Sequence, residues 1–339
     1  MLKCPNNFTV DFGKKLIEYL DPTADISMIK YNWCWKDFGE QFKYLESKIM
    51  RYFEQVKEGE PVKAVFYLIH YCKYNIEWGK KTIENNQIGQ FAYYTYLMAS
   101  NHYCTCQWAE KIIENSQSED RNKAILKMLI VNNSKQSWFK TVIMNSRIGD
   151  PSNIVYFAVR HNMLNRKWAE NFISNCKIGN PSYAAFLMVR DCNSDYKWAQ
   201  IIIDNCEVGD IAMSAVSLLR IIGNSYITIK WVNKIIKKSN NCNICFPAYI
   251  MVRDYGFSIQ WFINIVNKYI IEDKLFFQKY NPSYIIYILT RYHNLNRLYA
   301  EMIIKKCKKN NHIIDLMVRY CGSSKKWAEN IKNRYNNEI

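Results

Sequence analysis

WFKTVIMNSRIGDPSNIVYFAVRHNMLNRK, residues 138–167, is followed directly by WAENFISNCKIGNPSYAAFLMVRDCNSDYK, residues 168–197. The two stretches are copies of one thirty-residue pattern, and each begins with a tryptophan. The same spacing recurs outward at Trp78, Trp108 and Trp198. A fixed period of this length is typical of a protein that stacks one small structural unit many times.

Residues 168–197 predict two short helices and two turns. Apolar residues recur at three- and four-residue spacing over 168–173 and again over 184–189, as in helices with one buried face. Gly179 and the pair Asn180-Pro181 stand between them. We expect Gly179 to adopt the left-handed conformation beyond the first helix, and Asn180 to cap a second helix that begins at the proline.

Equivalent residues form columns along the chain. Each first helix carries an isoleucine, followed two positions later by an asparagine that we expect to bond a backbone carbonyl near the helix end. A small residue comes next, which we interpret as the point where neighbouring first helices approach closely. The isoleucines are Ile83, Ile113, Ile143, Ile173, Ile203, Ile236 and Ile304. The small residues are Ser116, Ser146, Cys176, Cys206, Ser239 and Cys307.

The tryptophan column is interpreted as a row of structural wedges between successive helix pairs. Each would bury on the order of 200 Å² and place its indole N–H near a loop carbonyl. The alternative is an exposed aromatic ladder on which bases stack. The tryptophans concerned are Trp78, Trp108, Trp138, Trp168, Trp198, Trp231, Trp261 and Trp327.

These patterns predict an all-α protein, a right-handed α-solenoid of about nine helix-turn-helix repeats of roughly 30 residues with a cap at each end. We expect residues 1–47 to form an N-terminal helical and aromatic cap, residues 48–326 the nine repeats, and residues 327–339 a C-terminal capping helix. The repeat at Trp261 carries an eight-residue insertion around 271–277. Insertions in repeat proteins lie in loops on one face, often the binding face.

The period and the helix-pair pattern over roughly residues 48–335 resemble the HEAT-like class of short helical-hairpin repeats. The resemblance implies a protein that holds partners along an extended surface, which is an analogy at the level of the fold.

The charge is concentrated in the C-terminal part. The chain carries a formal net charge of +16, and residues 221–339 hold 19 Lys and Arg against 7 Asp and Glu. Such asymmetry predicts that the C-terminal half faces an acidic protein, a nucleic acid or an anionic surface. The alternative is a coding bias. An AT-rich genome, as in some viruses, parasites and bacteria, enriches Asn, Ile, Lys, Tyr and Phe together and would raise the charge without a function.

The remaining signals limit the compartment and the chemistry. No apolar run approaches the ~20 residues that span a bilayer, and the first ten residues lack a signal-peptide core. We therefore expect a soluble intracellular protein, in the cytoplasm, the nucleus or a viral factory. Several of the twelve cysteines stand where serine stands in other repeats, and Cys242 with Cys245 has no second pair to complete a zinc site. No metal or other cofactor is expected.

One constellation bears on function. Six successive repeats place an arginine near the end of the second helix, at Arg160, Arg190, Arg220, Arg253, Arg291 and Arg319. One interpretation is internal: each arginine favours the helix macrodipole and pairs with a glutamate of the next first helix, such as Glu170, Glu301 or Glu329. The other is an external row of guanidinium groups that tracks phosphates or an acidic protein segment.

Catalytic motifs are absent. The two Asp-Phe-Gly triplets lack the other elements of a kinase site, and the five histidines show no ligand spacing. The leading hypothesis is a non-catalytic scaffold that binds an acidic protein through its basic C-terminal half. The alternatives are a nucleic-acid-binding helical-repeat protein, which would grip the phosphate backbone with the arginines, and an enzyme built on a repeat scaffold.

Overall fold

The computed structural model describes residues 62, 65–66, 69–70, 75–85, 90–118, 120–239, 244–271, 282–305, 307 and 311–337. The expected N-terminal cap at residues 1–47, the start of the first repeat and most of the insertion at 271–277 lie outside these ranges. The described residues are all-helical, with seventeen α-helices and no strand. The chain divides into two compact units, residues 1–165 and 166–339.

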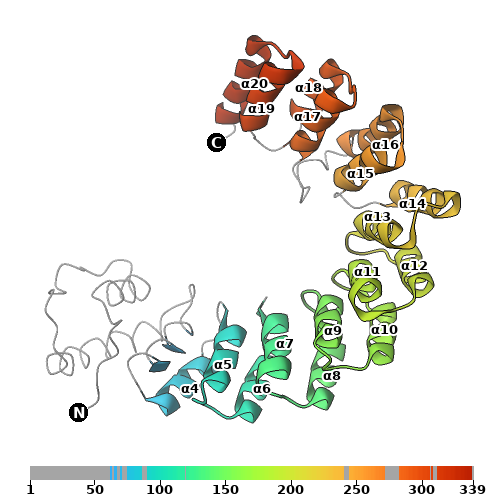
Figure 1. The fold of residues 1–339 in the computed structure, drawn as a ribbon. Coiled ribbons are helices and arrows are strands. Elements are labelled where there is room, and N and C mark those ends of the chain that lie inside the picture. The colour runs from blue at the N-terminus through green and yellow to red at the C-terminus, as the bar shows by residue number, and fades with distance from the viewer. Residues whose placement is uncertain are drawn as a thin grey trace, which may run out of the picture. The chain divides into compact units, whose positions relative to one another are not determined.

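Helices alternate between two kinds in both units, and Figure 1 shows them as successive pairs. A front helix carries the repeat tryptophan, or Tyr299 in its place, and the back helix follows it. Unit 1 holds α4 (Ile76–Asn85), α5 (Phe91–Ser100), α6 (Cys106–Glu114), α7 (Arg121–Val131), α8 (Gln136–Met144) and α9 (Pro151–Arg160). Even-numbered helices are front helices and odd-numbered helices are back helices.

Unit 2 continues the alternation. Its helices are α10 (Arg166–Asn175), α11 (Pro181–Cys192), α12 (Tyr196–Asn205), α13 (Ile211–Ile222), α14 (Tyr226–Lys238), α15 (Cys245–Tyr255), α16 (Ile259–Ile271), α17 (Pro282–Tyr292), α18 (Arg297–Lys305), α19 (Asn311–Cys321) and α20 (Lys325–Asn337).

The core of each unit runs along the back helices. Consecutive back helices pack against one another, as α5 does on α7 and α11 on α13, and back helices also contact the front helix that follows them, as α5 contacts α6 and α13 contacts α14. The front-helix isoleucine column faces this core, because all seven isoleucines are at most 2% exposed. The apolar periodicity therefore identified the buried face of the front helices.

The turn from front to back helix has the predicted geometry. Gly149, Gly179 and Gly209 have φ values of 68°, 72° and 80°, in the left-handed region that glycine adopts without steric cost. Asp150 and Asn180 then cap α9 and α11: each side-chain oxygen accepts the backbone N–H three residues later, and proline occupies the first helical position. This turn could be predicted from the sequence because the glycine, the capping residue and the proline each act on the backbone within three residues of themselves.

Successive turns are also locked to each other. Asn180 Oδ1 accepts the backbone N–H of Asp210, one repeat later, at 3.0 Å. The approach is so close that a Cβ on Gly209 would lie 2.8 Å from Asn180 Cα. Nearby, the buried hydroxyls of Ser182 and Ser214 lie 3.1 Å apart. These contacts fix the register of α11 against α13.

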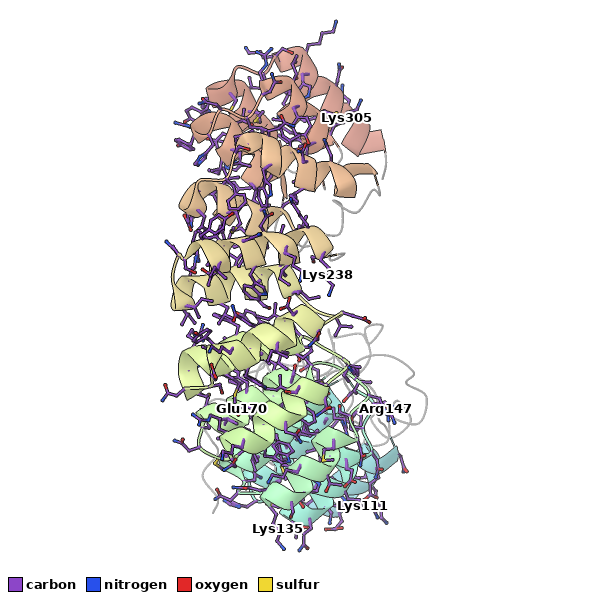
Figure 2. The ribbon with its side chains drawn as sticks, turned by 90° about the vertical axis from the view of Figure 1, so that its right-hand side faces the viewer. Lys111, Lys135, Arg147, Glu170, Lys238 and Lys305 are labelled. Atoms are coloured by element: carbon purple, nitrogen blue, oxygen red, sulfur yellow. The ribbon has the colours of Figure 1, made fainter. Side chains whose placement is uncertain are left out.

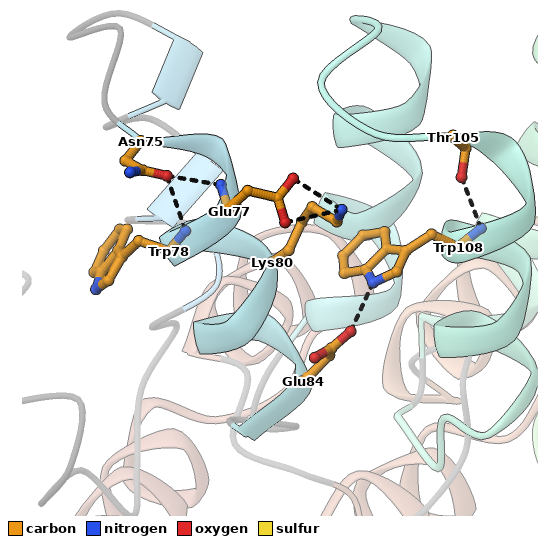
Figure 3. Close-up of polar contacts among 7 residues, drawn as sticks. All are labelled: Asn75, Glu77, Trp78, Lys80, Glu84, Thr105 and Trp108. Atoms are coloured by element: carbon orange, nitrogen blue, oxygen red, sulfur yellow. Dashed lines mark hydrogen bonds and ion pairs between the residues drawn. The ribbon is translucent and has the colours of Figure 1, made fainter.

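The tryptophans join one front helix to the one before it. The indole N–H of Trp108 donates to Glu84 Oε1 at 2.7 Å (Figure 3), and that of Trp198 donates to Ser174 Oγ at 3.0 Å. Trp231 and Trp261 likewise donate to side chains of α12 and α14. The repeat tryptophans are half-buried, and the next residue in each front helix is the one that is fully buried. The indole partners here are therefore side chains and not the loop carbonyls expected from the sequence.

The two polar columns at the front-helix ends make local bonds. Asn115 and Asn175 donate to the carbonyls of Lys111 and Asn171, four residues earlier, as predicted. The small residues also make local bonds: Ser146 Oγ, Cys176 Sγ and Cys206 Sγ each donate to the carbonyl two positions later, at 3.2, 3.3 and 3.1 Å. Serine and cysteine interchange in this column because both are small and carry a donor.

Candidate interaction surface

Within each unit, the repeat arginines lie at the edge where the back helices end. Each occupies the last turn of its helix, α9, α11, α13, α15, α17 or α19, and each is exposed. A cation at this position is favoured by the macrodipole. We call the five arginines of unit 2, Arg190, Arg220, Arg253, Arg291 and Arg319, the arginine row.

Aromatic rings one turn earlier support several of these side chains. Arg190 and Arg253 lie over the rings of Phe186 and Tyr249, with the guanidinium carbon 5.5 and 5.2 Å from the ring centroid. Arg291 donates to the Tyr287 hydroxyl at 2.8 Å, and in unit 1 Arg160 donates to that of Tyr156. Positions four apart share a helix face, so an aromatic residue four before the arginine was a readable signal that the sequence analysis missed.

Carboxylates pair with three members of the row. Asp191 accepts two hydrogen bonds from Arg190, both at 2.7 Å. Asp254 accepts from Arg253, its chain neighbour, and from Arg220 of the preceding repeat, whose Nη2 lies 2.8 Å away. The hydrogen bond from Arg253, followed by that from Arg220, outweighs desolvation and lowers the pKa of Asp254 to about 2. Asp254 is therefore ionised at neutral pH and ties two repeats together.

Tyrosines replace the carboxylates near the C-terminal end of the row. The Arg291 guanidinium lies 4.0 Å from the ring centroid of Tyr320, one repeat later, and 5.1 Å from that of Tyr292. Arg319 lies 5.9 Å from the Tyr320 ring. Tyr292 and Tyr320 are 61% and 46% exposed, so this end of the row offers both aromatic and cationic groups to solvent.

The predicted pairing of a repeat arginine with a glutamate of the next front helix is corrected at Glu301, the glutamate expected to pair with Arg291. Glu170 and Glu301 pair within their own helices, with Arg166 and Arg297, at 3.6 Å. Residues four apart lie on the same face of a helix and can pair there. The repeat arginines lie on the back helix, and a loop separates them from these glutamates. Glu329 is exposed on α20.

A second pair of arginines performs the locking role that the sequence analysis considered for the row. Arg166 and Arg297, each the first residue of a front helix, donate to the carbonyls of Asn193 and Gly322, in the loop that ends the next back helix, both at 2.7 Å. Asn193 and Gly322 have φ values of 56° and 74°. The residue after each, Ser194 or Ser323, donates its N–H to a carbonyl six residues earlier, that of Met188 or Met317, so the end of each back helix is closed by a backbone bond.

Some lysines of unit 2 lie at the opposite edge, where the front helices end. Lys238 and Lys305 stand in the last turns of α14 and α18, and Figure 2 shows both on the same side of the unit. Lys238 Nζ donates to the carbonyl of Asp204, at the end of the preceding front helix, at 2.9 Å. The basic charge of unit 2 is therefore divided between an arginine edge and a lysine edge.

A groove opens on the arginine edge, between the ends of α11 and α13 and the starts of α12 and α14. Its volume is about 480 Å³, and its apolar lining comes from Val189, Tyr196, Ile221 and Ile222. Asp195 and Thr228 supply polar atoms, and the Asp195 carboxylate already accepts the backbone N–H of Lys197. Val189 and Ile221 are the chain neighbours of Arg190 and Arg220, so the groove adjoins the row.

An unusual surface feature lies beside the groove. The repeat that begins at Trp198 is three residues longer than the others of thirty residues, and it is extended in the turn at Gly223, Asn224 and Ser225. This extension lets α14 begin five residues before Trp231, capped by the Ser225 hydroxyl. Tyr226 and Ile227, in the added turn, are each 78% exposed. Two large apolar residues exposed side by side next to an apolar groove are typical of a contact surface.

The described residues contain no cluster of three His, Cys, Asp or Glu side chains that could hold a metal ion. Burial raises the pKa of the Cys104 thiol to about 12, and it also raises the pKa of the Cys307 thiol. None of the described helices is both long enough and apolar enough to cross a membrane. Comparisons with models of protein families, with curated proteins and with solved structures found no match.

Proposed function

We propose that this chain is a non-catalytic α-solenoid scaffold whose arginine row binds an acidic protein partner. The proposal rests on one observation: the row presents guanidinium groups at regular places on one edge of unit 2, and Arg190, Arg220 and Arg253 keep 42–45% of their side-chain surface exposed. The packing of consecutive back helices and the recurrent junctions between front helices support the solenoid.

The chemistry of the row favours a protein over a nucleic acid. Arginine and tyrosine are enriched in protein interfaces and at their energetic centres. Asp191 and Asp254 lie within the row and would repel a continuous line of phosphates. A protein surface presents separate carboxylates with apolar groups between them, and it can avoid those two positions.

A nucleic acid is the second candidate, and one observation favours it. Tyr292 and Tyr320 flank Arg291 and are exposed, and such rings can stack on bases beside a cation that holds the backbone. Binding of this kind would fall steeply with salt, because each phosphate contact releases counterions.

The test is affinity capture from the native cells with the full chain as bait, with and without nuclease. Compared are the wild type, Arg190→Glu/Arg253→Glu, and the charge-matched control Lys234→Glu/Lys237→Glu on exposed positions of α14. A nuclease-resistant acidic protein that the arginine variant loses and the lysine control retains supports the proposal. A partner retained equally by both variants, or one lost after nuclease treatment, contradicts it.

A further inference from the structure

We infer that the groove between the ends of α11 and α13 and the starts of α12 and α14 receives a short extended segment of the acidic partner, with an aliphatic or aromatic side chain in the groove and a neighbouring carboxylate on Arg220. The inference rests on the proposed function and names the kind of segment that the surface recognises.

The shape and lining of the groove fit an apolar anchor. Its volume of about 480 Å³ falls within the roughly 300–1,000 Å³ typical of ligand clefts. Val189, Tyr196, Ile221 and Ile222 line it, and Ile221 is 44% exposed and Tyr196 42% exposed. An apolar side chain seated here would remove this surface from water, which is the main source of favourable free energy in such contacts.

The surface around the groove favours a chain segment over a small molecule. Tyr226 and Ile227 stand between the lining residues Ser225 and Thr228 and are 78% exposed. A small ligand inside the groove would leave these two side chains in water. A peptide that continues past the groove can cover them, so the apolar area extends in the way expected for an interface with a protein.

The positive charge beside the groove favours a segment that carries carboxylates. Arg220, the neighbour of Ile221, donates through Nη2 to Asp254, and a guanidinium has five N–H donors. With 45% of its side chain exposed, Arg220 can take a second carboxylate. Arg190, the neighbour of Val189, is equally exposed. Carboxylates of the partner would meet this rim and avoid Asp195, an acidic residue among those that line the groove.

The experiment selects a phage-displayed library of random twelve-residue peptides on the full chain, and the strongest binder is then synthesised and its affinity measured. The groove variant is Ile221→Asn. The matched control is Ile201→Asn, on α12, where the isoleucine is 59% exposed and lines no part of the groove. Thermal unfolding of each variant is measured to check that the fold is retained.

We expect selected peptides to combine an aliphatic or aromatic residue with a nearby Asp or Glu. Their affinity should fall about tenfold on Ile221→Asn, as expected for the loss of one aliphatic contact, and stay unchanged on Ile201→Asn. Peptides that lose affinity on Arg190→Glu/Arg253→Glu but not on Ile221→Asn would overturn the groove while leaving the proposed function intact. Peptides that need Ile221 but no acidic residue, or a selection that yields no binder, would overturn the inference as well.

Discussion

The indole N–H of Trp108 donates a hydrogen bond of 2.7 Å to Oε1 of Glu84, which lies 24 positions earlier on the preceding front helix (Figure 3). Lys80 of that helix lies 5.8 Å from the centroid of the same indole. A contact of this type recurs at Trp198, Trp231 and Trp261. The repeat tryptophan is thus a junction between front helices that combines a ring contact with one hydrogen bond.

Trp138 is a repeat tryptophan without this hydrogen bond in the described part of the chain, so it can serve as a control for Trp108. Its indole N–H is buried and has no hydrogen-bond partner among the described residues. The carboxylate at the equivalent position is Glu114, which interacts electrostatically with Arg121. We predict that Trp108→Phe lowers the free energy of unfolding by about 1 kcal/mol, the net value of one hydrogen bond, whereas Trp138→Phe costs less or stabilises. Urea unfolding of both variants measures the difference, and equal losses would contradict it.

Gly209, in a front-to-back turn, is expected to stabilise the fold for two separate reasons. Its φ of 80° disfavours a side chain, and a Cβ would lie 2.4 Å from Asn180 Oδ1 and 2.8 Å from Asn180 Cα. At Gly256 φ is 71°, but nothing lies within 4 Å of an added Cβ. We predict that Gly256→Ala costs about 1–2 kcal/mol for the backbone conformation alone, and that Gly209→Ala costs clearly more. Chemical unfolding of the two variants tests the close approach, which would be refuted by equal costs.

Arg121 is a buried cation that the sequence analysis did not single out. It is 6% exposed. Its Nε and Nη2 donate to the last carbonyls of α6, those of Ile113 and Glu114, at 3.3 and 3.2 Å, and Nη1 donates to Ser146 Oγ. We predict that Arg121→Met lowers the free energy of unfolding by about 2–3 kcal/mol, because it leaves buried acceptors unpaired. Lys135→Met, at an exposed position of the same unit, should change it by less than about 0.5 kcal/mol.

The bridge at Asp254 predicts a pH dependence. Its pKa lies at about 2 in the folded chain and near 3.8 without partners. A lowered folded-state pKa stabilises the fold above the unfolded pKa, and this contribution is lost as the pH falls from about 4 to about 2. We expect Asp254→Asn to be less stable than the wild type at pH 6, and we expect this gap in the free energy of unfolding to narrow below pH 4 and to close only as the pH falls below about 2. Because the pair is partly exposed, the gap should be small and should shrink with salt. A gap that is constant with pH would contradict the bridge.

The local parts of this structure could be predicted from sequence, whereas its cross-repeat contacts could not. Gly179, Asn180 and Pro181 each act within a few residues of themselves, so their types were sufficient to predict the turn. The partner of the Trp198 indole is 24 positions away, and its identity depends on how α12 rotates against α10. The same holds for Arg166, whose acceptor at Asn193 belongs to the next repeat.

The arginines illustrate the same limit at the candidate site. Their spacing predicted that they lie near the ends of the second helices, and the structure places them there, as at Arg190, Arg220 and Arg253. Their partners did not follow from spacing. Arg190 turns to its chain neighbour Asp191, and Arg220 reaches Asp254 of the next repeat. The groove was equally unforeseeable, because it depends on side chains from four helices.

Hydrogen–deuterium exchange of the full chain, alone and with the captured acidic partner, tests the central claim most directly. The account predicts added protection at the back-helix ends of unit 2, in the segments around residues 189–196, 220–228 and 253–257. Protection confined to the lysine edge, around residues 207–209 and 237–239, or a stable complex with no added protection in unit 2, would contradict it.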